Sequence, residues 1–332
     1  MKELAIVILN YNGKKLLQQF LPSVISHSDE ASVYVIDNKS EDDSIDWLET
    51  HYNDQLTIIP LAKNHGFAGG YNEGLKRVNE PYWCLLNSDV RVTENYTVRP
   101  LKLLRENANI AAVQPKIKSE RHPDFLEYAG AAGGFLDYLG YPFCRGRLFQ
   151  YNEKDNGQYD DEIEVFWTTG ACMFIKRSAF ENVGGFDSAY FAHQEEIDLC
   201  WRLHHKGLKF LYTSKSTVYH LGGSTLTNQN PFKTYLNFRN SLFTLVKNLL
   251  AFELPLIVLN RLVLDGIAGI VFLFQGKPKH TFAILKAHFN FYFALPRLMK
   301  QRRSIQPKYR TRKPLSIVIQ HFVLNRKKIL KF

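Results

Sequence analysis

Leu4-Ala5-Ile6-Val7-Ile8-Leu9, followed directly by Asn10-Tyr11-Asn12, opens the chain and indicates how its first half folds. A continuous apolar run of this length is typical of a strand buried on both faces, as strands are in parallel sheets covered by helices. The polar residues at its end mark the carboxyl edge of such a sheet, where ligands bind in open α/β folds. Lys14–Ser26 then has the pattern of a helix.

The same unit of strand, polar cluster and helix repeats along the chain. Further strands are predicted at residues 33–36, 56–61, 82–86, 111–113 and 166–175. Helices are predicted at residues 44–51, 68–78, 97–106 and 195–206. Residues 120–165 are irregular and predict a long excursion with short strands. This alternation predicts an α/β fold with a mostly parallel sheet flanked by helices.

The charge of the chain is divided unevenly. Its 332 residues carry 42 Lys and Arg against 32 Asp and Glu, a formal net charge of +10. Residues 226–332 hold 19 of the basic residues and only two acids, a net +17, which leaves −7 for residues 1–225. Such a basic segment predicts a polyanionic partner or a membrane surface. Hydrophobic residues at 45% and charged residues at 22% exclude a disordered or fibrous chain.

The cysteines and the N-terminus predict a cytoplasmic protein. The four cysteines have no C-x-x-C spacing, which argues against a disulfide framework or a zinc site and for a reducing compartment. The apolar run at residues 4–9 is too short for a signal peptide. We therefore expect the chain to remain in the cytoplasm.

Composition also predicts two domains. Residues 1–225 form the α/β domain, with a first half at about 1–115 and a second at about 116–225, and residues 226–332 form a basic, apolar, helical extension. Charged residues such as Arg261 and Asp265 interrupt the apolar run at 242–274, and its uninterrupted part, 267–274, is too short to span a membrane. We expect helices with a basic face that lie on an anionic membrane surface.

Two acidic groups have both a structural and a chemical interpretation. Asp89 follows a predicted strand, where it either caps a turn or holds a divalent cation against a diphosphate. Glu195, Glu196 and Asp198 open a predicted helix. There they either supply favourable charge at the helix N-terminus, with Asp198 paired to the arginine four residues on, or include a general base.

A histidine and a glycine-rich run are two further candidates for a binding site. His220 ends an apolar stretch and is either a structural histidine or a metal ligand. The glycine-rich run at residues 64–74 permits a tight turn and close backbone approach to a ligand. It is not a P-loop, because no G-K-[ST] follows, nor the dinucleotide fingerprint, which belongs after the first strand.

In this order the segments resemble glycosyltransferase family 2, in its rhamnosyltransferase-like branch, whose members have the GT-A fold. The resemblance rests on residues 9–12, 36–42, 64–74, 87–89, 168–172, 184–187 and 195–196. It covers residues 4–223. Residues 224–332 resemble only the basic, aromatic, membrane-associated end that is common in that branch.

The resemblance implies roles for the matching residues. The nucleotide-sugar site comprises Leu9, Asn10, Tyr11, Asn12, Asp37, Asn38, Asn64, Gly66, Phe67, Gly70, Asn72, Asn87 and Ser88. The family's D-x-D motif has Asn as its first member here, so Asp89 is the metal carboxylate, with His220 as a further ligand for Mg²⁺ or Mn²⁺. The catalytic set is Glu196, as the general base, with Glu195 and Asp198.

We therefore predict an inverting, metal-dependent enzyme that moves one sugar from a nucleotide diphosphate sugar to a hydroxyl of a glycan acceptor. The basic extension suggests a lipid-linked acceptor and a peripheral position on the cytoplasmic face of the membrane, and the resemblance to the rhamnosyltransferase-like branch implies cell-surface polysaccharide synthesis. The Q-x-x-R-W motif of processive members is absent. A sugar nucleotidyltransferase is the first alternative, although it needs a Gly-rich basic loop after the first strand. Nucleic-acid binding through residues 226–332 is disfavoured, because their aromatic residues lack an RNA-stacking pattern.

Overall fold

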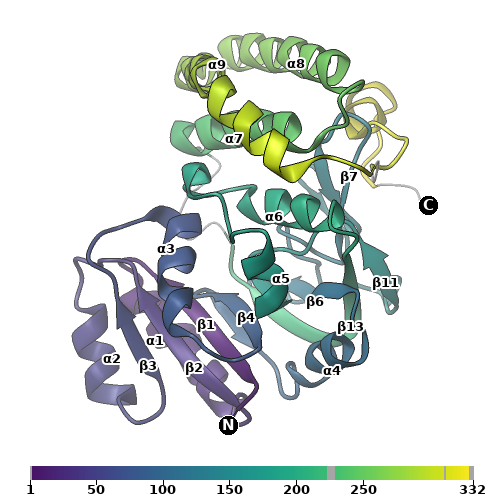
Figure 1. The fold of residues 1–332 in the computed structure, drawn as a ribbon. Coiled ribbons are helices and arrows are strands. Elements are labelled where there is room, and N and C mark those ends of the chain that lie inside the picture. The colour runs from purple at the N-terminus through teal and green to yellow at the C-terminus, as the bar shows by residue number, and fades with distance from the viewer. Residues whose placement is uncertain (1, 223–228, 310–311, 329–332) are drawn as a thin grey trace.

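The computed structural model of the protein describes residues 2–222, 229–309 and 312–328. An α/β body carries the N-terminus, and three long helices lie together at the opposite end of the molecule (Figure 1). The predicted domain boundary at residues 225 and 226 lies outside the described residues.

The body is built on one large mixed sheet. Its strands are β1 (Leu4–Asn10), β2 (Ala31–Asp37), β3 (Thr57–Pro60), β4 (Tyr82–Asn87), β5 (Val90–Val92), β6 (Ile110–Ser119), β11 (Glu162–Val165), β12 (Cys172–Lys176) and β13 (Lys209–His220). Their order is β11-β13-β6-β12-β4-β1-β2-β3, and β5 pairs with β13. The strands β4-β1-β2-β3 are parallel, as is the β6–β13 pair, whereas β12 runs antiparallel between β4 and β6. The predicted α/β sheet is confirmed, and its parallel part is concentrated in the first half.

Helices cover both faces of this sheet. They are α1 (Lys14–Ser26), α2 (Ser44–Tyr52), α3 (Gly66–Gly74), which continues into a 3-10 turn (Leu75–Arg77), α4 (Val98–Glu106), α5 (Arg177–Asn182) and α6 (Glu195–His204), the last preceded by a 3-10 turn, η2 (Ser188–Tyr190). In β1, Ala5 and Val7 belong to the core on one face, and Ile6 and Ile8 belong to the core on the other. An unbroken apolar run is required here because neither face of the strand meets water.

The predicted excursion forms a second, four-stranded antiparallel sheet. Its strands are β7 (Gly134–Leu136), β8 (Pro142–Cys144), β9 (Arg147–Leu148) and β10 (Tyr151–Asn152). The chain returns to the main sheet earlier than predicted, at β11 within the expected excursion, and of the predicted strand at 166–175 only the part in β12 is a strand. Before β12, the backbone N–H of Thr169 donates to the side-chain Oε1 of Gln114 on β6 (2.9 Å) and not to the backbone of that strand.

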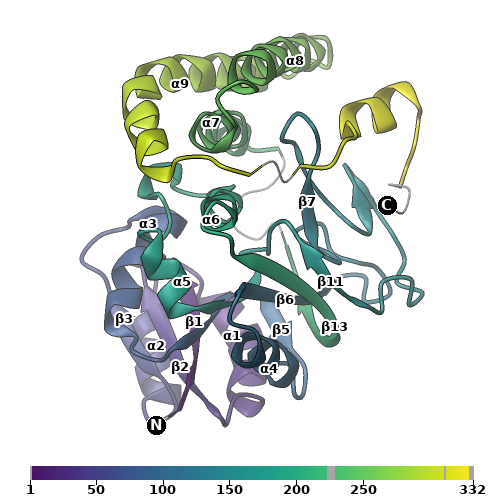
Figure 2. The ribbon, with the colours of Figure 1, turned by 45° about the vertical axis from the view of Figure 1, so that its right-hand side comes forward.

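After residue 229 the chain forms α7 (Pro231–Asn248), α8 (Leu254–Phe274) and α9 (Pro278–Ile305). The helix α7 packs against α9 and α8 on one side and against α6 on the other, and Figure 2 shows it between α6 and the outer pair. Residues 312–328, which include a short π-helix (Ile319–Val323), return to the second sheet, where the backbone N–H of Lys313 donates to Leu136 O (2.8 Å). The extension therefore packs on the body and is not a detached tail.

The helix that forms from the apolar run is longer than its uninterrupted part at 267–274, on which the expectation of no membrane span rested. Among the described helices, α8 alone is long and apolar enough to cross a membrane, with 21 residues and a mean hydropathy of 2.1. Arg261 and Asp265, which interrupt the run in the sequence, lie on the buried side of the helix. Arg261 donates to Leu139 O (3.1 Å) and Asp265 pairs with His288 (3.2 Å). The exposed side of α8 is apolar.

Candidate active site

The carboxyl ends of β1 and β2 meet in a small polar network. Asn10 is fully buried, and its Nδ2 donates to Oδ1 of Asp37 (3.1 Å) and to the hydroxyl of Ser40 (3.1 Å). The other oxygen of Asp37 accepts the backbone N–H of Ser40 (2.9 Å). Parallel pairing of the two strands sets Asn10 opposite Asp37 and so brings these two predicted site residues together.

The glycine-rich segment packs directly on this edge. Asn38 Nδ2 donates to Asn64 Oδ1 (3.0 Å) and to the carbonyl oxygen of Gly66 (3.0 Å). A Cβ at Gly70 would lie 2.8 Å from Leu9 Cδ1 and 3.1 Å from Asn38 Nδ2. Only glycine therefore lets α3 lie this close to the ends of β1 and β2.

The remaining predicted donor-site residues divide between the rim and the interior. Tyr11 is 42% exposed and Asn12 is also exposed, so both lie at the rim. Phe67 packs among aromatic rings. Asn72 donates to Phe186 O (2.7 Å) and accepts the Phe186 N–H (3.0 Å). Its amide thus holds the loop that leads to α6.

The predicted metal-binding residues meet beyond the end of β4. Nε2 of His220 lies 3.1 Å from Oδ1 of Asp89 and Nδ1 lies 3.3 Å from Oε2 of Glu127, and all three side chains are buried. Asn87 and Ser88 are half-buried, with Asn87 Nδ2 3.5 Å from the same Nε2. Burial lowers the pKa of His220, but the charges of Asp89 and Glu127 outweigh this effect and raise it to about 10. The imidazole is therefore protonated between two carboxylates when no cation is bound.

A divalent cation fits this arrangement. An imidazole nitrogen and a carboxylate oxygen that face each other at 3.1 Å are suited to share an ion with bonds of about 2.1 Å. No group of three or more His, Cys, Asp or Glu side chains within the described ranges is arranged to hold a metal. The protein would thus provide two ligands and leave the other positions for phosphate oxygens and water, as is common for Mg²⁺.

Glu195 and Glu196 lie at the N-terminus of α6, and each has one carboxyl oxygen that accepts no hydrogen bond from the described residues. Oε2 of each is buried and has no hydrogen-bond partner among the described residues. Burial raises the pKa of Glu196 to about 7, and burial and the charge of Glu196 raise the pKa of Glu195 well above its ordinary value. Glu196 is the more exposed of the two. The pair can accept a proton near neutral pH.

The charges of Glu127, on the metal side, and Glu196, on the base side, both act on the buried thiol of Cys144. Burial raises the pKa of the Cys144 thiol to about 11, and the charges of Glu127 and Glu196 both add to that rise. Cys144 ends β8 of the second sheet.

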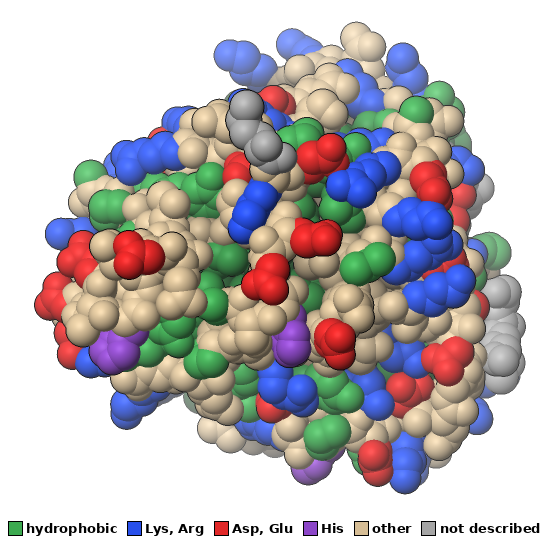
Figure 3. Space-filling view, turned by 90° about the horizontal axis from the view of Figure 1, so that it is seen from below, with side chains coloured by type: hydrophobic (Ala, Val, Ile, Leu, Met, Phe, Trp, Pro, Cys, Tyr) green, Lys and Arg blue, Asp and Glu red, His purple; other side chains and the backbone are tan. Residues whose placement is uncertain are grey.

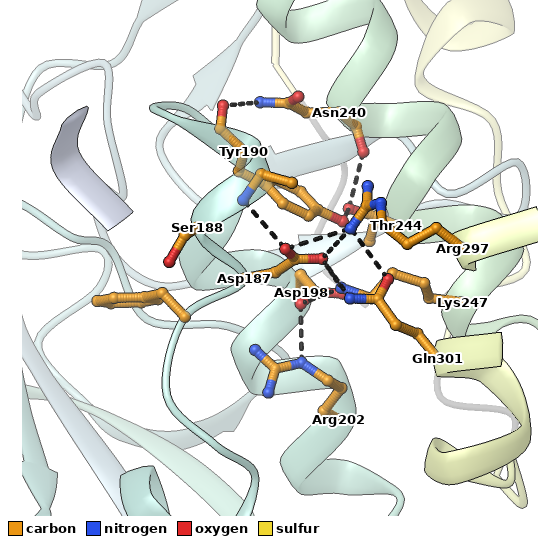
Figure 4. A network of polar contacts seen from close by, with 12 residues as sticks. Asp187, Ser188, Tyr190, Asp198, Arg202, Asn240, Thr244, Lys247, Arg297 and Gln301 are labelled. Carbon is orange, nitrogen blue, oxygen red and sulfur yellow. Dashed lines mark hydrogen bonds and ion pairs between the residues drawn. The ribbon is translucent and has the colours of Figure 1, made fainter. Parts of the chain in front are cut away.

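Asp198 does not join the other two acids, which corrects the expectation that it belongs to the catalytic set. Its side chain is fully buried one turn into α6, where Oδ2 pairs with Arg202 (2.8 Å) and Lys247 (2.9 Å). Oδ1 accepts from Asn248 Nδ2 (3.0 Å). Figure 4 shows this carboxylate turned toward α7, beside Asp187. Its oxygens are occupied by the protein itself, so it fixes α6 in place.

Sequence reasoning missed two side chains of this region. Glu127 lies in the irregular stretch without any motif around it, and only the fold brings it to His220. Lys247 lies within the apolar run at 242–274, yet its side chain is 1% exposed and lies between Asp187 (3.0 Å) and Asp198. A lysine inside an apolar stretch was the available signal, because such a residue needs a buried partner.

Comparison with known proteins decides the family. Residues 5–184 match the family described as Glycosyl transferase family 2. The chain belongs to this family. The prediction made from the motifs is confirmed.

Relatives of this glycosyltransferase include two rhamnosyltransferases. Rhamnosyltransferase WbbL of Escherichia coli K12 is 39% identical over 214 residues, which are 62% of this chain and 79% of the relative. The N-acetylglucosaminyl-diphospho-decaprenol L-rhamnosyltransferase of Mycobacterium tuberculosis H37Rv is 27% identical over 236 residues, 65% of this chain and 75% of the relative. These relatives confirm the rhamnosyltransferase-like branch and an enzyme of the hexosyltransferase type.

Solved structures confirm the GT-A fold. The mannosyltransferase PcManGT of Pyrobaculum calidifontis, in complex with GDP-Man and Mn²⁺, superposes with a TM-score of 0.55 at 13% identity, over 87% of each chain. At this identity the likeness concerns the fold alone.

Proposed function

We propose that this glycosyltransferase moves one sugar from a nucleotide diphosphate sugar to a hydroxyl of a lipid-linked glycan, with inversion at the anomeric carbon. The observation that carries the proposal is the pair of buried carboxyl oxygens without partners at the N-terminus of α6. The Asp89–His220 pair supplies the diphosphate side of the same proposal. A proton acceptor beside a diphosphate site is what direct displacement by a hydroxyl requires.

The donor nucleotide binds at the ends of β1 and β2. Asp37 and Asn10 are held rigidly by each other, and Oδ1 of Asn10 is buried without a partner among the described residues. A nucleobase presents N–H groups that such oxygens can accept. The exposed Tyr11 supplies an aromatic surface at the rim of the same site.

Glu196 acts as the general base. It removes the proton of the acceptor hydroxyl while the acceptor oxygen forms a bond to the anomeric carbon. The bond from that carbon to the diphosphate oxygen breaks, and its electron pair leaves with the nucleoside diphosphate. Because attack and departure take place on opposite sides of the carbon, the configuration inverts.

Asp89 and His220 would hold Mg²⁺ or Mn²⁺. When bound, the ion neutralises the charge that develops on the leaving diphosphate. Glu127 lies behind the imidazole at 3.3 Å and keeps Nδ1 protonated, so that Nε2 faces Asp89. The complex of PcManGT with Mn²⁺ supports a divalent ion in this fold.

The exposed sides of α8 and α9 support a membrane position for the enzyme. Large apolar side chains line them, from Leu256, Leu259, Val263, Ile267, Ile270 and Phe274 on α8 to Phe282, Phe289 and Phe293 on α9. The face at the opposite end of the molecule has acidic and basic side chains interspersed (Figure 3). With its basic extension, the protein would lie on the anionic cytoplasmic leaflet. One relative's name specifies a diphospho-decaprenol acceptor, which is consistent with a lipid-linked substrate.

A donor panel with one variant tests the proposal. UDP-, GDP- and dTDP-sugars are incubated with lipid-linked acceptor, with and without Mn²⁺, and release of nucleoside diphosphate is measured. Glu196→Gln should lose about 10²–10⁴-fold in turnover and keep donor affinity, whereas Glu49→Gln, an exposed control on α2, should keep both. Near-normal turnover of Glu196→Gln would reject the base. Release of pyrophosphate from a nucleoside triphosphate would favour the nucleotidyltransferase.

A further inference from the structure

The loop that leads into α6 has an unusual backbone. Phe191, His193 and Gln194 have φ values of 64°, 69° and 68°, in the region that side chains other than glycine rarely adopt. The next two residues are Glu195 and Glu196. Strain of this kind persists only where the surroundings hold the backbone in place, so the structure around the loop must supply the restraint.

One side of the restraint is Asn240 of α7, in the C-terminal extension. Asn240 is fully buried. Its Nδ2 lies within hydrogen-bond distance of the carbonyl oxygens of Tyr190 (3.0 Å), Ala192 (2.9 Å) and His193 (2.8 Å). Figure 4 shows the amide directed at Tyr190. One side chain thus binds the carbonyl groups on both sides of Phe191.

Arg239 reinforces this contact. Its Nη2 donates to the carbonyl oxygens of Ala189 (2.9 Å) and Tyr190 (3.0 Å). Its Nε donates to Oδ1 of Asn240 (2.9 Å), which turns the NH₂ group of the amide toward the loop. The two neighbouring residues therefore act together.

The other side of the restraint is the glycine-rich segment at the donor site. The carbonyl oxygen of Phe191 accepts the backbone N–H groups of Phe67 (2.6 Å) and Ala68 (3.2 Å). A Cβ at Gly66 would lie 2.5 Å from the Phe191 ring. The loop is thus clamped between the donor-binding segment and α7.

We propose that Asn240, oriented by Arg239, is a positioning residue that holds the loop 191–194 so that α6 presents Glu196 to the acceptor. This proposal rests on the proposed role of Glu196 as the base. Asn240 touches no substrate. Without its donors the loop relaxes toward negative φ values and the first turn of α6 loses its direction, while the donor site at β1 and β2 stays intact.

The test compares Asn240→Ala with Asn290→Ala in the full chain. Asn290 is exposed on α9, where its amide donates to Lys286 O of its own helix (2.9 Å). For Asn240→Ala we expect kcat to fall at least 30-fold, with the donor Kd, measured by calorimetry, within threefold of the wild type. Hydrogen exchange of the backbone amides of residues 191–197 should accelerate, while that of β1, β2 and β4 is unchanged. Asn290→Ala should match the wild type in all three measurements.

Two results would overturn the proposal. One is a folded Asn240→Ala variant with wild-type kcat or with unchanged exchange at residues 191–197. The other is loss of donor affinity in step with kcat, which indicates a general structural defect. If Asn240→Ala does not fold, Arg239→Ala replaces it, with the same expectations at smaller amplitude. The exchange measurement also separates the two proposals, because it tests the clamp even if Glu196→Gln proves that the base lies elsewhere.

Discussion

At the scale of single residues, His220 shows how two carboxylates determine what an imidazole does. Asp89 faces one of its nitrogens and Glu127 the other. Asp89 is suited to share a cation with His220, while Glu127 fixes which imidazole nitrogen is free to bind that cation. Removing the carboxylate of Glu127 should therefore weaken cation binding without removing a ligand of the cation.

We predict that Glu127→Gln weakens Mn²⁺ binding about 10–100-fold, the usual effect of losing a partner of this kind. Binding is measured by electron paramagnetic resonance titration of free Mn²⁺ in the presence of nucleoside diphosphate. Glu120→Gln, which breaks a part-exposed pair with Arg91, serves as the control. Equal Mn²⁺ affinity in Glu127→Gln and the wild type would show that Glu127 does not orient the imidazole.

A second residue-scale prediction concerns the pH dependence of turnover. Burial raises the pKa of Glu196 to about 7, because it disfavours the charged form. A base works only when ionised, so kcat should rise through pH 7 and fall about tenfold per pH unit well below it. The measurement is kcat at saturating donor from pH 5 to 9, with donor affinity followed in parallel. An acid limb centred near the ordinary glutamate value would contradict this assignment.

At the scale of elements, α8 separates its charged and apolar residues between two sides. Its buried positions are Ile257, Arg261, Asp265 and Gly269, spaced by four residues and therefore on one face of the helix. The charges that interrupt the sequence thus point into the protein, where they have partners. The outward side is left to apolar residues that fit the boundary of a lipid bilayer.

We predict that Leu259→Glu with Ile270→Glu reduces binding to vesicles of phosphatidylglycerol and phosphatidylcholine at least tenfold. Both positions are more than half exposed, at 61% and 56%, and a charge there opposes burial in lipid. Co-sedimentation over a salt series provides the measurement, with Gln55→Glu on the exposed surface of the body as control. Unchanged vesicle binding, or a shift from dimer to monomer in its place, would assign this surface to another partner.

At the scale of the whole molecule, a buried ionic network joins the body to the extension. Lys247 of α7 and Arg297 of α9 pair with Asp187, and Lys247 also pairs with Asp198 of α6 (Figure 4). Burial alone would raise the pKa values of both aspartates. The positive charges of Lys247 and Arg297 beside Asp187, and of Lys247 and Arg202 beside Asp198, outweigh burial, so both pKa values are lowered. Both acids are therefore ionised inside the protein and depend on cations from elements far apart in the sequence.

We predict that Lys247→Met lowers the free energy of unfolding by about 3–5 kcal/mol, the usual cost of leaving a buried charge without its partner. Asp198→Asn in the same chain should recover part of the loss. Urea unfolding followed by circular dichroism gives the values, with the exposed Lys279→Met as control. A change below 1 kcal/mol would show that the other cations suffice.

Much of the fold and part of the site could be predicted from sequence because their signals are local. An apolar run such as residues 4–9 implies burial on both faces, and the polar residues after each strand must gather at one edge of a parallel sheet. The positions of Asn10, Asp37 and Asp89 follow from that rule. The motifs in their order were sufficient for the family, the GT-A fold and the type of enzyme.

Only the tertiary structure decided which charged side chains face each other. Asp198 has the same sequence context as Glu195 and Glu196, yet α7 supplies it with Lys247 and Asn248, which occupy its oxygens. Glu127 and Asn240 carry no motif, and their roles exist only because remote segments meet. Local patterns record burial and backbone preference, whereas the ionisation and function of a buried polar group depend on partners that folding brings from elsewhere in the chain.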